Sequence, residues 1–177
     1  MPAELERSNV MKKPERKKHA PKKKVARRTS RKKASLVPPM YDDRKPSEVT
    51  DGYWLHAYRK KLGYPRATPR CGKWLVFAPM ADIDSLWAKI KLATEEGRLG
   101  DSSKVATAVP NPNSTNPDSS VICVYTYDWQ DEEDVRRIRE ELRKLGIVNK
   151  IPYKSDEDTR DGKYRVAGHT RISKYYE

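Results

Sequence analysis

The pattern of apolar and polar positions is clearest in residues 120–147, which begin as a strand. Side chains from Ser120 to Tyr127 alternate with a period of two, so the two sides of this strand differ in composition. One side carries Ile122, Val124 and Thr126, and the other carries Val121, Cys123, Tyr125 and Tyr127.

An amphipathic helix is predicted directly after this strand. The acidic stretch 128–134 favours a helix start, because negative charge is stabilised at a helix N-terminus. Gly146 favours the end of the helix, since glycine readily adopts the left-handed conformation found there. Between them, apolar side chains recur at helical spacing at Val135, Ile138, Leu142 and Leu145. The strand and the helix together predict a unit in which the helix covers a sheet.

The same two patterns recur along the chain. The apolar run 73–78 predicts a strand that Pro79 ends, and Asp82 can cap a helix that ends near Gly97. Further strands are predicted at 104–109 and 147–153, a strand or helix at 52–63, and a strand or hairpin at 163–175. This order predicts an α+β domain with a mostly antiparallel sheet and helices on one face.

Charge divides the chain into two parts. Residues 1–35 hold 14 Lys and Arg against 3 Glu, so they carry about +11 of the formal net charge of +13. They are poor in apolar side chains, and such a segment buries too little surface to fold alone. We therefore predict a disordered basic arm at 1–35, a proline-containing linker at 36–51 and a domain at 52–177.

The basic arm predicts contact with phosphates, because clustered Lys and Arg bind a nucleic-acid backbone by releasing counterions. Such clusters also serve as nuclear import signals or anchor a chain in a ribonucleoprotein, and a solvated tail without a partner is the remaining interpretation. Expected partners are RNA or another phosphorylated ligand, and an import receptor, in the nucleus and/or the cytoplasm. The candidate nucleic-acid-binding residues are Lys22, Lys23, Lys24, Arg27, Arg28, Arg31, Lys32 and Lys33, with Trp129 as an aromatic surface for a base.

Other classes of protein are not supported by the sequence. Cys71 and Cys123 are too few for a disulfide scaffold or a zinc site, so we expect reduced thiols in an intracellular protein. No apolar run is long enough to cross a membrane. Nucleophile elbows, Walker loops and dinucleotide-binding glycine motifs are also absent. We expect a monomer without a cofactor or metal.

Several segments carry a resemblance to known proteins. Residues 72–76, 84–87, 122–127, 145–147 and 153–159 resemble the core of the translation initiation factor 4E fold, which has a curved, mostly antiparallel sheet. The run from Trp54 to Tyr176 is similar to the basophilic leukaemia expressed protein family, which has the same fold and is often labelled as a phosphothreonine lyase domain. The resemblance covers about 120 residues, the domain but not the arm.

Cap binding by the initiation factors requires aromatic residues around the methylated base, an acidic residue at its edge and basic residues for the phosphates. The loop that supplies a Trp-Glu pair in those factors is 64–70 here, and it contains neither residue. The hairpin that supplies the phosphate-binding cations is 110–120 here, and it contains no Lys or Arg. The sequence therefore argues against cap recognition.

Two functions of different classes are predicted for the domain. The first is non-catalytic binding of RNA or another phosphate-bearing ligand, by loop-borne basic and aromatic residues such as Arg70, Lys154 and Lys163. The second is β-elimination of phosphate, which the resemblance to the phosphothreonine lyases implies, with Lys104 as the base and Lys73 as a phosphate ligand.

The lyase hypothesis leaves the general acid open, because Leu75 stands where the lyases have a histidine. His56 or His169 would have to replace that histidine, and His169 is the candidate acid. The candidate phosphate ligands besides Lys73 are Arg160, Arg165 and Arg171.

Overall fold

The computed structural model describes residues 42–111, 116, 118–164, 167–170 and 172–177. The chain divides into two units, residues 1–35 and 36–177, and every described residue belongs to the second unit. The predicted basic arm lies outside the described residues. Within the part that is described, no helix has both the length and the apolar character needed to cross a membrane.

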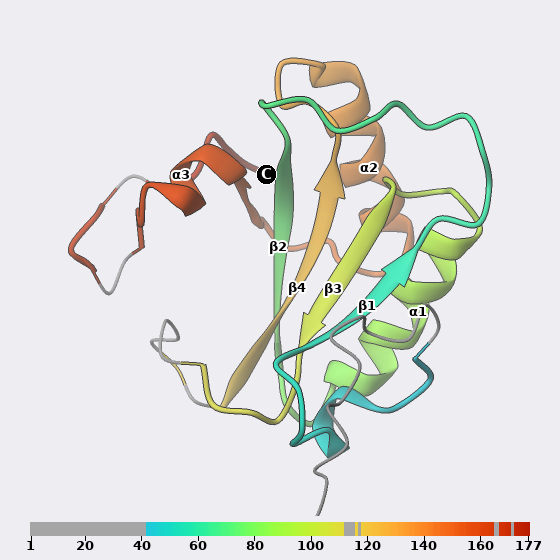
Figure 1. Ribbon diagram of the computed structural model, residues 1–177, viewed down its shortest axis with the longest axis vertical. Coiled ribbons are helices and arrows are strands. Elements are labelled where there is room, and N and C mark those ends of the chain that lie inside the picture. The colour runs from blue at the N-terminus through green and yellow to red at the C-terminus, as the bar shows by residue number, and fades with distance from the viewer. Residues whose placement is uncertain (1–41, 112–115, 117, 165–166, 171) are drawn as a thin grey trace, which may run out of the picture. The chain divides into compact units, whose positions relative to one another are not determined.

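The described strands form one twisted and curved sheet in which every neighbouring pair is antiparallel (Figure 1). The order across the sheet is β1-β3-β4-β2-β5-β6. The strands are β1 (Trp54–Tyr58), β2 (Gly72–Pro79), β3 (Ser102–Ala106), β4 (Ser119–Thr126), β5 (Pro152–Ser155) and β6 (Tyr175–Tyr176). This arrangement confirms the predicted α+β fold with a mostly antiparallel sheet.

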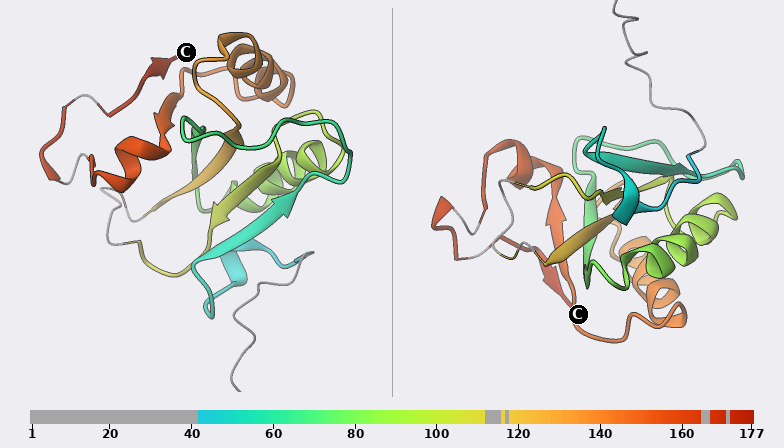
Figure 2. Two further views of the ribbon diagram at one scale, coloured as in Figure 1. Left: turned by 45° about the horizontal axis from the view of Figure 1, so that its top comes forward. Right: turned by 90° about the horizontal axis from the view of Figure 1, so that it is seen from below.

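Two long helices, α1 (Ile83–Glu95) and α2 (Glu132–Lys144), cover one face of the sheet (Figure 2). The core lies between this face and the helices. Trp74 is fully buried there, and its indole N–H donates a hydrogen bond to the Val135 carbonyl at 3.1 Å. The alternation in 120–127 is confirmed, since Ile122, Val124 and Thr126 are buried on this side.

Local sequence accounts for the ends of α2. The Asp131 side chain accepts a hydrogen bond from the Asp134 backbone N–H at 3.1 Å, and so caps the helix. Three further acidic residues follow in the first turn, where the helix dipole stabilises negative charge. After the helix, Gly146 has a φ of +98°, a conformation that glycine adopts without strain. Both predicted ends of this helix are therefore confirmed.

Two short helices complete the described elements: the 3₁₀ helix η1 (Pro46–Glu48) and α3 (Asp156–Arg160). η1 lies in the predicted linker, yet it packs on α1. The Ser47 N–H and hydroxyl donate to the Asp84 carboxylate at 3.0 and 2.6 Å, and Val49 is buried in the core. Residues 42–51 therefore belong to the folded domain, because an apolar side chain and a polar anchor join them to it.

Two other expectations differ from the structure. The strand predicted at 104–109 runs from Ser102 to Ala106, and the chain then turns so that the Ala108 N–H donates to the carbonyls of Pro46 and Val49. The strand or hairpin predicted at 163–175 is wrong for most of its described residues, since of these only Tyr175 pairs with the sheet, as part of β6. A turn with Gly168 at a φ of +84° interrupts the segment.

Candidate functional site on the open face of the sheet

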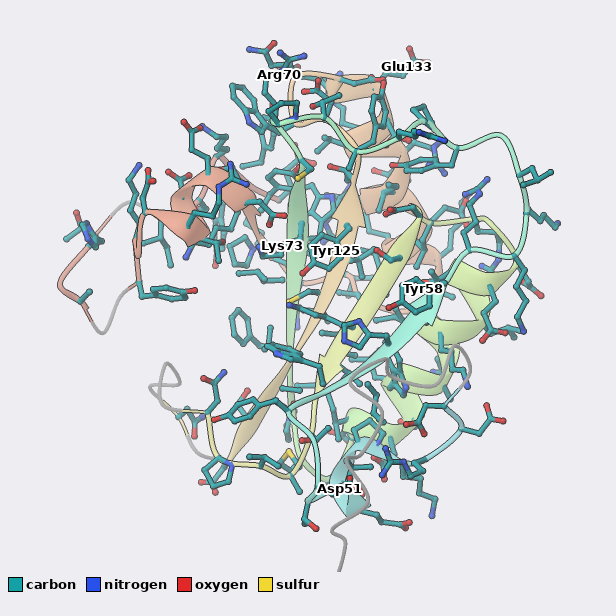
Figure 3. The ribbon with its side chains drawn as sticks, viewed as in Figure 1. Asp51, Tyr58, Arg70, Lys73, Tyr125 and Glu133 are labelled. Carbon is teal, nitrogen blue, oxygen red and sulfur yellow. The ribbon has the colours of Figure 1, made fainter. Side chains whose placement is uncertain are left out.

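The face of the sheet opposite α1 and α2, here called the open face, carries charged and aromatic side chains. It is formed by the residues that alternate with the core residues on each strand. Strand pairing places His56 opposite Lys104, Lys104 opposite Cys123, and Lys73 opposite both Tyr125 and Lys154. Figure 3 looks onto this face and shows Lys73 and Tyr125 close together near its centre. Three lysines from three strands thus share one side of the sheet.

Lys73 is buried and already neutralised. Its ammonium group forms a salt bridge with Asp156, at the start of α3, and donates to the Thr159 hydroxyl at 3.1 Å. The second oxygen of Asp156 accepts from the Cys71 thiol at 3.3 Å. Burial raises the pKa of the Cys71 thiol, and the Asp156 carboxylate raises it further. In this structure the carboxylate occupies the position on Lys73 that a bound anion would take.

Lys104 is half-buried and has no carboxylate or hydrogen-bond acceptor within reach among the described residues. Its ammonium nitrogen lies 4.1 Å from the centre of the Trp54 ring and 5.7 Å from that of Tyr125, so aromatic faces are its main contacts. Burial lowers the pKa of Lys104, and the positive charge of Lys73 lowers it further. This amine is the most available cation on the open face.

Lys154 is only 3% exposed, yet it also lacks a carboxylate partner among the described residues. Its ammonium group donates to the Lys163 carbonyl at 2.5 Å and lies 3.7 Å from the centre of the Tyr164 ring. Burial lowers the pKa of Lys154, and so does the neighbouring charge of Lys73. Like charges directly opposite each other on a sheet are destabilising, so this pair of lysines opposes folding.

Tyr125 lies between the cations. The ammonium nitrogens of Lys73 and Lys104 are 5.5 and 5.7 Å from the centre of its ring, and are therefore no more than about 11 Å apart. Burial raises the pKa of the Tyr125 phenol, which keeps its proton at neutral pH. The ammonium groups of Lys73 and Lys104 lie near the neutral Tyr125 phenol, and the Asp156 carboxylate pairs with Lys73. Such an arrangement can hold an anion such as a phosphate group.

The structure brings together only some of the predicted site residues. Lys73 and Lys104 share the open face. Arg160 is exposed at the end of α3, and His169 is exposed in the turn before β6. Arg165, Arg171 and all eight predicted nucleic-acid-binding residues of the arm lie outside the described residues, so their roles stay predictions.

Other basic and aromatic candidates already have partners in the domain. Arg70 forms a salt bridge with Asp128 at 2.5 Å, and Lys163 forms one with Asp158 at 2.6 Å. Trp129 is half-buried against the core, and the ammonium of Lys174 lies 4.1 Å from the centre of its ring. A cavity of about 370 Å³ between Trp129 and the segment before β6 is not lined by any of the three lysines of the open face.

Two contributors to the open face, Trp54 and Tyr125, were not predicted as site residues, and Lys154 was predicted as a binding residue but in the wrong element. Lys154 was predicted in a loop, but it lies in β5 and is buried. Trp54 and Tyr125 were not connected with Lys104. The period-two pattern already placed Tyr125 on the side of Cys123, but the register that sets it beside the lysines is not visible in the sequence.

The described residues contain no group of three or more His, Cys, Asp or Glu side chains that could hold a metal ion. The donors that the open face offers are ammonium groups and the protonated Tyr125 hydroxyl.

Comparison with known proteins supports the fold. Residues 66–159 match the family described as basophilic leukemia-expressed protein Bles03. The structure of Schistosome eIF4E, the translation initiation factor 4E, complexed with m7GpppG and 4E-BP is similar with a TM-score of 0.55 and 19% identity, over 76% of this chain and 75% of that chain. The complex of the Schistosome protein with m7GpppA and 4E-BP gives the same values. At this identity the likeness concerns the fold.

Proposed function

Because the chain belongs to the basophilic leukemia-expressed protein Bles03 family and has the fold of eIF4E, we propose that it binds a phosphate-bearing ligand on the open face without transforming it. One observation carries the proposal: Lys73 and Lys104 both approach the Tyr125 ring, and Lys104 has no counter-charge among the described residues. The basic arm adds electrostatic contact with RNA or anchors the chain in a ribonucleoprotein.

The energetics of the open face support this proposal. Removing an ammonium group from water is costly unless a negative charge compensates it. Lys104 and Lys154 are both partly or fully removed from water, and no described carboxylate pairs with either of them. Strand pairing adds repulsion between Lys154 and Lys73. Clusters that oppose folding in this way are found at functional sites. A bound phosphate group supplies the missing negative charge.

The chemistry of the face favours recognition of the phosphate rather than of a methylated base. The Schistosome proteins are complexed with the cap compounds m7GpppG and m7GpppA. In the present chain the loop before β2 carries Tyr64, whose side chain already has partners within the domain. Its hydroxyl donates to the Asp134 carboxylate at 2.5 Å. Its ring also contacts Tyr127 edge-on and the Arg59 guanidinium. We therefore place the phosphate, and not a base, at the centre of recognition.

Binding of a phosphothreonine peptide and of adenosine monophosphate to the full chain tests the proposal by calorimetry. Lys73→Met and Lys104→Met should each weaken binding at least about 10-fold, because a hydrogen bond to a charged group contributes about 1.5–3 kcal/mol. The matched control is Lys89→Met, an exposed lysine on α1. Equal affinity of wild type and both open-face variants for these ligands would refute the proposed site.

The arm is tested separately in the full chain. Replacing its eight candidate Lys and Arg residues by Gln should reduce the slope of log affinity against log salt for single-stranded RNA, by about 0.7 for each phosphate that the arm no longer neutralises. The open-face variant Lys104→Met should keep the full slope. An unchanged slope after neutralisation of the arm would show that the arm does not contact RNA.

A second candidate function is β-elimination of phosphate from phosphothreonine, with Lys104 as the base. The observation that favours it is the lowered pKa of Lys104 on the same face as Lys73, because a lysine base must be deprotonated near neutral pH. His56 is the histidine opposite Lys104, but burial and the charge of Lys104 lower its pKa and make it a poor proton donor. His169 is exposed in the turn before β6.

Mass spectrometry of a phosphothreonine peptide incubated with the full chain distinguishes the two functions. A lyase converts the residue to a dehydrated product with release of phosphate, and Lys104→Ala abolishes the conversion. Binding without conversion, at several peptide sequences, supports the non-catalytic function and removes the lyase hypothesis.

A further inference from the structure

Lys104 differs from the other two lysines of the open face in having no polar partner among the described residues. Lys73 is paired with Asp156, and the ammonium of Lys154 donates to a backbone carbonyl. The Lys104 nitrogen lies over the Trp54 ring and near that of Tyr125, and it has no hydrogen-bond acceptor among the described residues. Without a carboxylate or other acceptor beside it, the ammonium form of an amine lacks stabilisation, and the deprotonated amine is a nucleophile.

The surroundings of Lys104 also favour the neutral amine. Trp54, Tyr125 and the buried Cys123 shield part of its side chain from water, and the charge of Lys73 acts on it from the same face. Burial is the largest cause of its lowered pKa, and the charge of Lys73 adds to it. Burial beside another cation is an arrangement that turns a lysine into a nucleophile at neutral pH.

We propose that Lys104 captures the carbonyl carbon of a small phosphorylated aldehyde as an imine, while Lys73 holds the phosphate group. This inference rests on the proposed function, since it uses the same phosphate site. The ligand must join a carbonyl and a phosphate within one small molecule, because the two ammonium nitrogens are no more than about 11 Å apart. An apolar or aromatic framework between the two groups would lie against Tyr125.

The reaction needs no oxidant or reductant. The lone pair of the Lys104 nitrogen attacks the carbonyl carbon, and the carbonyl π electrons move to the oxygen. A proton passes from nitrogen to this oxygen, and the resulting carbinolamine then loses water as the C=N bond forms. The amine and the aldehyde thus give one imine and one water molecule, and the reaction is reversible. The phosphate ester is not changed.

Pyridoxal 5′-phosphate is a suitable probe, because it joins an aldehyde to a phosphate and its imine absorbs visible light. Borohydride reduction of the full chain with substoichiometric probe converts the imine to a stable secondary amine, which peptide mass spectrometry locates. We expect labelling of Lys104 at least 10-fold above that of Lys89, the exposed lysine on α1. Lys104→Arg keeps the positive charge but removes the nucleophile, and it should abolish this label.

Two further labelling experiments test the role of the phosphate group. Pyridoxal, which lacks the phosphate, should label Lys104 at least 10-fold less. Lys73→Met should reduce labelling by pyridoxal 5′-phosphate to a similar extent. Both variants should retain the far-ultraviolet circular dichroism of the wild type, so that loss of labelling does not reflect loss of the fold.

The outcomes separate this inference from the proposed function. Labelling spread over exposed lysines without preference for Lys104 overturns the inference, and the proposed function stands if Lys73→Met still weakens the binding of phosphothreonine peptide. Equal labelling of Lys104 by pyridoxal and by pyridoxal 5′-phosphate also overturns it as stated, because the phosphate then has no part in capture.

Discussion

The two faces of the sheet are built from alternate residues of the same strands. Buried polar groups on the helix-covered face have hydrogen-bond partners, whereas two of the lysines on the open face lack a counter-charge among the described residues. On the helix-covered face, the buried Trp74 indole donates to the Val135 carbonyl. The Thr126 and Tyr153 hydroxyls, on the same face, lie 2.6 Å apart and share a hydrogen bond. On the open face Lys104 and Lys154 lack a counter-charge among the described residues, and Cys123 is buried beside Lys104.

This difference indicates that the helix-covered face stabilises the fold, while the open face serves function. Satisfied polar groups and buried apolar side chains stabilise a fold, whereas buried cations without partners destabilise it. A protein keeps such cations where they serve binding or chemistry, at some cost in stability. The helix-covered face is accordingly the structural half of the sheet, and the open face is the half that we assign to ligands.

The largest expected effect is loss of stability on the helix-covered face. Trp74→Ala should lower the free energy of unfolding by about 3–5 kcal/mol, because it leaves a large cavity in the core. The matched control on the same strand is Phe77→Ala on the open face, where the side chain is 57% exposed and the cost should stay below about 1 kcal/mol. Urea unfolding measures both values, and similar costs would contradict the division between the faces.

A smaller effect, on ligand affinity, is expected from substitution of Asp156, whose carboxylate forms a salt bridge with Lys73. Asp156→Asn should increase the affinity for a phosphothreonine peptide about 3- to 10-fold, since a bound phosphate no longer competes with the carboxylate. Calorimetry with the full chain measures this change. Weaker binding would instead show that Asp156 positions Lys73 for the ligand.

The same substitution should change the reactivity of Cys71. Burial is the first cause of its raised pKa and remains in the variant, but the contributions of the carboxylate disappear. The pKa of Cys71 should therefore fall in Asp156→Asn, and alkylation by iodoacetamide at neutral pH should be faster. Cys123 is an internal control, because burial raises its pKa to about 11 and it remains inaccessible. An unchanged rate at Cys71 would contradict the contact with Asp156.

The smallest expected effect is a gain in stability on the open face. Lys104→Met should raise the free energy of unfolding at neutral pH by about 1 kcal/mol, which is about 3 °C in Tm for a domain of this size. The variant removes an ammonium group that folding partly takes out of water, with no compensating charge from the described residues. Thermal unfolding of the two proteins tests this, and a loss of stability would show that the contact with the Trp54 ring outweighs the cost of burying the charge.

The sign of the pH dependence follows from the lowered pKa of Lys104. Between its folded value and the ordinary value of 10.5, the unfolded chain binds more protons, so stability rises with pH in this window. Lys154 acts in the same direction, whereas Cys123 opposes it, because its pKa is raised above the ordinary 9.0. The rise should be smaller in Lys104→Met than in wild type, and urea unfolding across this pH range measures the difference.

The sequence predicted the local units of the fold but not the assembly of the open face. Helical and period-two patterns located α2, β4 and the two sides of β4, because these depend on neighbouring residues in the chain. The pairing of Lys73 with Lys154 joins residues far apart in the sequence, and local periodicity does not encode this register. Lys154 was assigned to a loop because the predicted strand 147–153 ended one residue before it, whereas β5 runs from Pro152 to Ser155.

Other differences have similar physical causes. Residues 42–51 carry proline and charge, as a linker does, but Val49 enters the core and Ser47 binds Asp84. Lys73 and Lys104 were identified by resemblance to a family, and the structure adds that they face the same aromatic ring. The lack of a carboxylate beside Lys104, among the described residues, is a property of the folded chain that the sequence alone does not reveal.

The most direct test of a phosphate site on the open face is the titration of the Lys104 ammonium group by NMR, with its resonance assigned by comparison with Lys104→Met. Without ligand, its pKa should lie below the ordinary 10.5. At saturating inorganic phosphate the pKa should move up toward that value, because a bound anion stabilises the charged form. A Lys104 pKa that inorganic phosphate leaves unchanged would contradict the assignment of the open face as a phosphate-binding site.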